Sequence, residues 1–188
     1  IIRLENVFEA VYGRLATVYH RTSQRSIVDI ASKGFTSGSG DMYGEGIYAT
    51  YDLKSQLRTD MLQYGDVIVK AKINLYGFLI FDKKPAKIVY KDNYKLLDQL
   101  KKLKISLSEK EEERFADFDK KIKSSKYTSD FALKVSKMSV VKKLRGLIFT
   151  GRRDGEVAVI YNQEAITPMS YAFSDKNNLK ESSLSWKK

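Results

Sequence analysis

The sequence contains no cysteine, one histidine and two prolines among 188 residues. The absence of cysteine excludes disulfides and thiolate–zinc sites, and a single histidine excludes a His-rich metal site. No apolar run reaches the roughly 20 residues of a membrane-spanning helix, so we expect neither a metal nor a membrane partner. Hydrophobic residues make up 43% and aromatic residues 12%, a globular composition. We therefore expect one domain over residues 1–188, with an ordinary hydrophobic core.

The start of the chain carries no signal-peptide pattern, and it begins with Ile1 rather than methionine. We therefore expect this sequence to be a piece of a longer protein.

Positive charge is concentrated in one part of the chain. Residues 1–82 carry 9 basic and 9 acidic side chains, and residues 146–188 carry 6 and 5. Residues 83–145 carry 19 basic and 9 acidic side chains, so this segment accounts for almost all of the net charge of +11. The segment either is a solvated helical face that maintains solubility or is a surface that binds a polyanion.

Hydrophobic periodicity in the first part predicts short helices and strands around a sheet. The expected elements are a helix over 4–15, a strand over 17–20, a helix from Thr22 or Ser23 to Gly34, a strand over 47–50, a short helix over 53–62, and strands over 66–75 and 78–81.

The basic segment changes to a helical period. Its helices are marked by Leu96, Leu97, Leu100 and Leu103, by a Ser108–Glu111 capping box before Phe115, Phe118 and Ile122, and by Phe131, Val135, Met138 and Val141. Strands over 147–150 and 157–161 follow, separated by the turn 151–155, and residues 174–188 read as a polar tail. The expected fold class is α+β, with a core over 17–82 and 146–171 and a basic helical insertion over 83–145.

Three short motifs contain residues that could carry chemistry. They are YHRTS at 19–23, GEGIYAT at 44–50, which follows a loop rich in glycine, and GEVAVIY at 155–161. Taken singly, His20, Tyr48 and Glu156 are each more often structural residues. In this order, however, the motifs resemble the ADP-ribosyltransferase superfamily, specifically its His–Tyr–Glu branch of diphtheria-like toxins and poly(ADP-ribose) polymerases. The strands over 66–75 and 78–81 are also similar to the central strands of that family.

The resemblance implies a split β-sandwich with NAD+ bound between two small sheets, and a catalytic set of His20, Tyr48 and Glu156. His20 would bind the sugar hydroxyls, Tyr48 would stack on nicotinamide, and Glu156 would accept a hydrogen bond from the ribose 2′-hydroxyl. A carboxylate there opposes the positive charge of the oxocarbenium ion that forms as nicotinamide leaves.

The resemblance also implies further NAD+-binding positions. These are the Arg21 backbone, Thr22, Gly46 and a second stacking tyrosine, for which the spacing leaves Tyr51 and Tyr64 both open.

Two features depart from that family or limit its branches. Arg21 follows the histidine where many relatives have glycine, so its side chain must point away from the site or meet a phosphate. The Arg–Ser–Glu branch would need a Ser-x-Ser strand and a Glu-x-Glu turn. The turn here holds Asp154 and Glu156 and no suitable Ser-x-Ser strand is found, so we set that branch aside.

The expected activity is NAD+-dependent transfer of ADP-ribose to a protein or nucleic-acid acceptor, as a single transfer rather than a polymer. It would operate where NAD+ is present, in the cytoplasm of the producing cell or, for a toxin or effector, of a target cell. One alternative is an RNA 2′-phosphotransferase of the same fold, for which Arg21 and Arg25 would be the basic residues. The other is an inactive version of the fold that binds nucleic acid.

Overall fold

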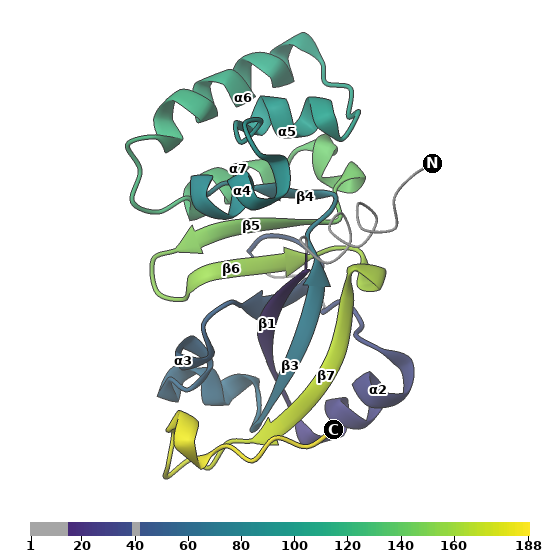
Figure 1. Ribbon diagram of the computed structural model, residues 1–188, viewed down its shortest axis with the longest axis vertical. Helices are drawn as coiled ribbons and strands as arrows, with labels where there is room; N and C mark the ends of the chain where they lie inside the picture. Colours follow the sequence, from purple (N-terminus) through teal and green to yellow (C-terminus); the bar gives the residue numbers. More distant parts are fainter. Residues whose placement is uncertain (1–14, 39–41) are drawn as a thin grey trace.

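The computed structural model describes residues 15–38 and 42–188, which form one mixed seven-stranded sheet with helices around it (Figure 1). The α+β class is therefore confirmed. The order of strands in the sheet is β4-β5-β6-β2-β1-β3-β7. Within the described ranges, no helix has the length and apolar character needed to cross a membrane.

The strands are β1 (Leu15–Thr22), β2 (Ile47–Thr50), β3 (Val67–Asn74), β4 (Phe78–Ile80), β5 (Gly146–Gly151), β6 (Gly155–Ile160) and β7 (Ile166–Phe173). The α-helices are α2 (Gln24–Lys33), α3 (Leu53–Gln56), α4 (Lys83–Tyr90), α5 (Leu96–Lys102), α6 (Glu109–Ile122) and α7 (Ser129–Ser136). Short 3₁₀ helices are η1 (Thr59–Tyr64), η2 (Ser139–Lys143), η3 (Gln163–Ala165) and η4 (Glu181–Ser183).

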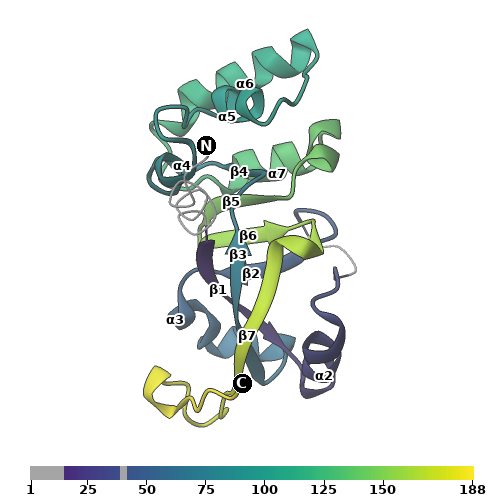
Figure 2. The same ribbon diagram turned by 45° about the vertical axis from the view of Figure 1, so that its right-hand side comes forward.

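The sheet is weakly joined between β1 and β2. These two strands pair at one position, Tyr19 with Thr50, whereas β1 pairs with β3 along its whole length from Leu15 to Thr22. The sheet therefore divides into a β4-β5-β6-β2 part and a β1-β3-β7 part, whose strands run in clearly different directions (Figures 1 and 2).

The two faces of β6 belong to two different hydrophobic cores. Ala158 and Ile160 pack in a core that also contains α2 and α4 residues, and Val157 and Val159 pack in a core with α5, α6 and α7 residues. This follows from strand geometry, because successive side chains point to opposite faces. Glu156 lies two residues before Ala158, so its side chain points to the same face as Ala158 and away from Val157.

The basic segment connects two parallel neighbours in the sheet. Strands β4 and β5 pair in parallel, and α4, α5, α6, α7 and η2 lie between them in the chain. A parallel pair cannot be closed by a tight turn and needs a crossover connection. The Ser108–Glu111 capping box at the start of α6 is present, so that prediction is confirmed.

Several predicted elements have different limits. The helix over 4–15 falls almost entirely outside the described residues, and its last residue, Leu15, begins β1. The helix over 53–62 is instead the short helix α3 followed by the 3₁₀ helix η1, and the third helix of the basic segment ends at Ser136 and continues as the 3₁₀ helix η2.

Two elements were not predicted, the helix α4 and the strand β7. Pro85 lies in the first turn of α4, where proline is tolerated because that amide has no partner within the helix. Pro168 lies in β7, an edge strand, and β7 shows little regular burial.

The prediction of a polar tail over 174–188 is wrong in part. Leu184 packs against a small cluster that includes Leu53 and Ile68, and Lys187 forms a β-bridge with Tyr171. The ring of Trp186 lies 6.2 Å from that of Tyr19. Scattered apolar residues thus hold this segment against the sheet.

Candidate functional site

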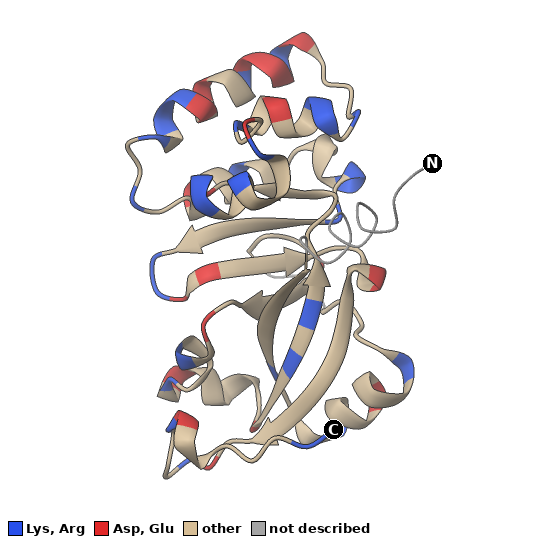
Figure 3. Ribbon diagram, viewed as in Figure 1, with Lys and Arg blue, Asp and Glu red and all other residues tan. Residues whose placement is uncertain are grey.

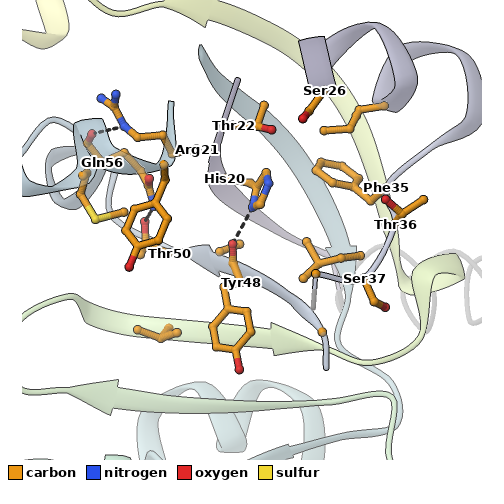
Figure 4. A pocket seen from close by; sticks show the side chains of 18 of the residues that line it. His20, Arg21, Thr22, Ser26, Phe35, Thr36, Ser37, Tyr48, Thr50 and Gln56 are labelled. Atoms are coloured by element: carbon orange, nitrogen blue, oxygen red, sulfur yellow. Dashed lines mark hydrogen bonds between the residues drawn. The ribbon is translucent and has the colours of Figure 1, made fainter. Parts of the chain in front are cut away.

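A cavity of about 440 Å³ lies where β1 and β2 diverge, with α2 on one side and α3 and η1 on the other (Figure 4). Of the predicted NAD+-binding residues, those that line it are His20, Arg21, Thr22, Gly46, Tyr48 and Tyr64. The structure therefore brings together residues that are up to 44 positions apart in the sequence. Tyr51 and Glu156 are not part of the lining.

His20 bridges the gap between the two parts of the sheet. Its Nδ1 lies 2.7 Å from the carbonyl oxygen of Tyr48 (Figure 4), and its ring meets the Phe35 ring edge-on, with 5.5 Å between centroids. A carbonyl oxygen can only accept, so Nδ1 carries the proton in this bond. The imidazole thus replaces a strand-to-strand hydrogen bond where β1 and β2 separate.

The second nitrogen of His20 is an acceptor. Burial lowers the pKa of His20, although the hydrogen bond to Tyr48 acts in the opposite direction. The neutral ring with its proton on Nδ1 leaves Nε2 as a lone-pair acceptor, and Nε2 has no partner among the described residues. The natural partner for such an atom is a hydroxyl group that enters the cavity.

The Arg21 side chain points away from the cavity (Figure 4). Its guanidinium donates to the carbonyl oxygens of Gln56 and Gly65, at 3.0 and 2.8 Å, and to Oγ of Ser174 at 3.0 Å. Only 4% of the residue is exposed. The guanidinium therefore ties β1 to α3, to the end of η1 and to the end of β7. The side chain thus points away from the site, as one of the two expectations for it had stated.

The backbone of Arg21 faces the cavity. The Tyr19 carbonyl accepts a hydrogen bond from Nε2 of Gln56 at 3.1 Å, and that amide also donates to Oγ1 of Thr50 at the end of β2. Backbone groups two residues apart in a strand point the same way, so the N–H and C=O of Arg21 also point toward the gap beside β2. The β1–β2 ladder consists of the Tyr19–Thr50 pair, and a ligand can therefore reach this edge.

The ring of Tyr48 is fixed by the loop that precedes β2. Its hydroxyl donates to the carbonyl of Gly44 at 2.8 Å and accepts from the backbone N–H of Tyr43 at 3.1 Å. Gly46 lies so close to β6 that an added Cβ would meet Val159 Cγ1 at 3.0 Å. Gly46, an expected NAD+-binding position, lies in the cavity wall. Its lack of a side chain also allows this segment to pack closely against β6.

The two candidates for a second tyrosine differ in position. Tyr64, at the end of η1, lines the cavity and is 53% exposed, so its ring is accessible. Tyr51 packs against the core, and its buried hydroxyl has no hydrogen-bond partner among the described residues. Burial, followed by the charge of Glu156, raises the pKa of Tyr51.

Glu156 lies at the edge of the site rather than in it. Asp154 and Val157 both line the cavity, so the Glu156 backbone is within a few ångströms of the wall. Its side chain lies on the Ala158 face of β6, near Asp82, Lys84 and Tyr51, and is not part of the cavity lining. Burial and then the charge of Asp82 raise the pKa of Glu156, whereas Lys84 lowers it.

Several lining residues were not predicted. They are Ser26, Asp29, Ile30, Phe35, Thr36, Ser37, Gly38, Ile47, Ala49, Thr50, Gln56, Met61, Asp154 and Val157. Asp154 could have been singled out, because it stands in the same turn as Glu156. Its carboxylate forms an ion pair of 2.6 Å with Arg58. Nothing in the sequence pattern distinguishes Gln56, whose place depends on the contact of α3 with β1.

Within the described part of the chain, no group of three or more acidic, histidine or cysteine side chains is arranged to hold a metal ion. Comparison with known proteins finds no family model, no curated protein and no solved structure that matches this chain.

Proposed function

We propose that this chain binds NAD+ in the cavity between β1 and β2, cleaves the bond between nicotinamide and ribose, and transfers ADP-ribose to a macromolecule. The observation that carries the proposal is His20, which is held by the Tyr48 carbonyl and presents an unpaired acceptor to the cavity. The proposal includes the finer description of the fold, an ADP-ribosyltransferase-like core whose two sheet parts separate at the site.

The lining supplies a partner for each polar part of the nicotinamide riboside. A ribose hydroxyl would donate to Nε2 of His20, and the Thr22 hydroxyl lies on the same wall. The carboxamide has one acceptor oxygen and donor N–H groups, so it can pair with both the N–H and the C=O of Arg21. These contacts need no arginine side chain, which agrees with the direction of the Arg21 guanidinium.

Two aromatic side chains can contact the nicotinamide ring. Tyr48 and Tyr64 come from different elements and both line the cavity. Stacking of a base on an aromatic ring contributes about 1–3 kcal/mol per base. We assign the second stacking position to Tyr64 rather than to Tyr51, because Tyr51 is packed into the core.

In the proposed step, the C1′–N bond breaks and nicotinamide leaves as a neutral molecule with the bonding electron pair. The ribose carries positive charge until the acceptor attacks C1′. Glu156 is assigned to stabilise that charge from the cavity edge nearest Asp82, although its side chain does not line the cavity. Asp154 does line it, but Arg58 neutralises much of its charge.

The two alternatives differ in their support. The RNA 2′-phosphotransferase needs basic side chains at the substrate, and Arg21 is instead held by backbone carbonyls and Ser174. A binding module without catalysis is the second candidate, and the absence of Glu156 from the cavity lining favours it.

The test uses purified protein and NAD+ labelled with ³²P in the adenylate phosphate. Release of nicotinamide measured by chromatography, together with label on macromolecules of a cell lysate, is the expected result. A cyclic phosphate product would instead support the phosphotransferase. If NAD+ remains intact over many hours, both enzymatic functions are excluded, and the binding module without catalysis is the remaining candidate.

A further inference from the structure

We propose that the acceptor is a single-stranded nucleic acid, whose phosphates bind a basic rim beside Glu156. We define the basic rim as Lys83, Lys84 and Lys87 of α4 together with Lys123 and Lys126 of the α6–α7 loop. This inference rests on the proposed function, since it names the acceptor of the same site.

Two threonines hold the parts of the rim together. Thr128, two residues after Lys126, donates from Oγ1 to Asp82 Oδ1 at 3.0 Å. Asp82 is the residue before α4, so this bond places the α6–α7 loop at the start of that helix. Thr150 of β5 donates to the other oxygen of Asp82 at 2.9 Å. Both ends of the carboxylate are therefore fixed.

The same contacts bring the rim to Glu156. Thr150 and Glu156 are directly opposite in the β5–β6 ladder, and Thr150 bonds Asp82. Lys84 is the cation whose charge acts on Glu156. In Figure 3, blue positions at the C-terminal end of α6 and in the loop after it lie on the same side of the molecule as the start of β6. An anionic chain on the rim would thus pass beside Glu156.

Among the described residues, no carboxylate forms an ion pair with a lysine of the rim. Of the 19 cationic side chains in 83–145, only Lys121 forms an ion pair with a carboxylate in the part of the chain that the structure describes. Arg58 differs, because it pairs with Asp60 and Asp154. Exposed like charges on adjacent segments repel each other, and a bound polyanion removes that repulsion.

The composition of the segment fits attraction to a phosphate backbone without bidentate recognition. It has 17 lysines and two arginines, and arginine is the residue that forms planar forks. Lysine acts as a point charge and attracts a phosphate backbone without reading bases. Tyr127, half-buried next to the rim with Lys126 Nζ 5.2 Å from its ring centre, offers an aromatic surface to an unpaired base.

The transfer step balances with these groups. A hydroxyl or exocyclic amine of the nucleic acid attacks C1′ as the bond to nicotinamide breaks. Nicotinamide takes the bonding electron pair, and the proton of the attacking group passes to the Glu156 carboxylate.

The test measures fluorescence anisotropy of a fluorescein-labelled 20-nucleotide RNA and the DNA of the same sequence. The rim variant changes Lys83, Lys87, Lys123 and Lys126 to Glu. The matched control changes Lys101, Lys102, Lys110 and Lys142 to Glu, which alters the net charge equally. We expect the wild type to bind with a log–log salt slope of about −0.7 for each phosphate neutralised. We expect the rim variant to lose at least about tenfold in affinity at a fixed low salt concentration, and the control to lose much less.

The same proteins are then incubated with ³²P-NAD+ and the oligonucleotide. The expected result is label on the oligonucleotide with the wild type and the control, little label with the rim variant, and equal NAD+ hydrolysis without acceptor in all three. Equal loss of binding in both variants, no binding by the wild type at low salt, or NAD+ consumption without label on the oligonucleotide would each overturn the inference. If the wild type does not consume NAD+ at all, the proposed function itself is wrong, whatever the RNA binding.

Discussion

Nδ1 of His20 donates a 2.7 Å hydrogen bond to the carbonyl oxygen of Tyr48, across the one place where the seven-stranded sheet divides. The bond fixes the tautomer and leaves Nε2 as the acceptor in the cavity. It also couples the YHRTS and GEGIYAT motifs directly, although 28 positions separate the two residues.

Replacing His20 by alanine should weaken NAD+ binding by about two- to tenfold, because the hydrogen bond from the ligand to Nε2 contributes about 0.5–1.5 kcal/mol. Titration calorimetry measures the affinity, and circular dichroism checks the fold. The matched control is Val28→Ala, an exposed position on α2. Equal affinities for the His20 variant and the wild type would mean that His20 has a purely structural role.

The two acidic residues of the β5–β6 turn should behave differently. Glu156→Gln keeps the shape but removes the charge that opposes the oxocarbenium ion, and loss of one such group costs about 10²–10³ in turnover. NAD+ affinity should stay close to normal. Asp154→Asn should have a much smaller effect on turnover, because Arg58 pairs with that carboxylate. Single-turnover NAD+ cleavage compares them, and the opposite ranking would assign the chemistry to Asp154.

The second stacking tyrosine can be identified with two pairs of variants. Tyr64→Ala should weaken NAD+ binding by the stacking contribution of about 1–3 kcal/mol, whereas Tyr64→Phe should retain it. Tyr51→Phe should leave both NAD+ affinity and thermal stability unchanged or slightly improved, since the hydroxyl it removes is buried without a partner among the described residues. A loss of affinity in Tyr51→Phe with no effect of Tyr64→Ala would exchange the two assignments.

Arg21 should matter for stability and not for substrate contact. Arg21→Lys cannot bond Gln56, Gly65 and Ser174 together, and each buried partner left unsatisfied costs about 1–3 kcal/mol. Urea unfolding should detect the loss. Activity per folded molecule should be retained if only the Arg21 backbone binds nicotinamide. A selective fall in turnover with normal stability would instead place the guanidinium at the substrate.

The pH dependence of the reaction should report on Asp82. A carboxyl group whose pKa is raised stays protonated to a higher pH, so activity that needs ionised Glu156 should rise with pH above the range of an ordinary glutamate. Burial is the main cause of that shift and Asp82 the second, while Lys84 opposes it. Asp82→Asn removes the negative charge, and the acidic limb of kcat/KM should therefore move to lower pH.

The control for this pH experiment is Asp119→Asn, a change at another carboxylate whose pKa is raised by burial but which bonds the backbone of α5. It should leave the acidic limb in place. A limb that does not move in Asp82→Asn would show that the two carboxylates act independently.

Local patterns in the sequence determined much of the scaffold. The alternation of DVIVKAKINL, the capping box at Ser108 and Glu111, and the apolar spacing of α6 each depend on neighbours within a few residues, and both elements, β3 and α6, are present. The order of the motifs around His20, Tyr48 and Glu156 was equally visible. For the same reason β7 was missed, because an edge strand with Pro168 has no regular pattern of its own.

Only the tertiary structure decided which of these residues meet. The separation of β1 from β2 creates the cavity, and it depends on how two parts of a sheet pack on different cores. The direction of the Arg21 guanidinium depends on carbonyls of residues 56 and 65, which no local pattern specifies. Strand alternation alone places Glu156 opposite Val157. That Val157 lines the cavity while Glu156 lies near Asp82 follows from long-range packing, since the same alternation allows either.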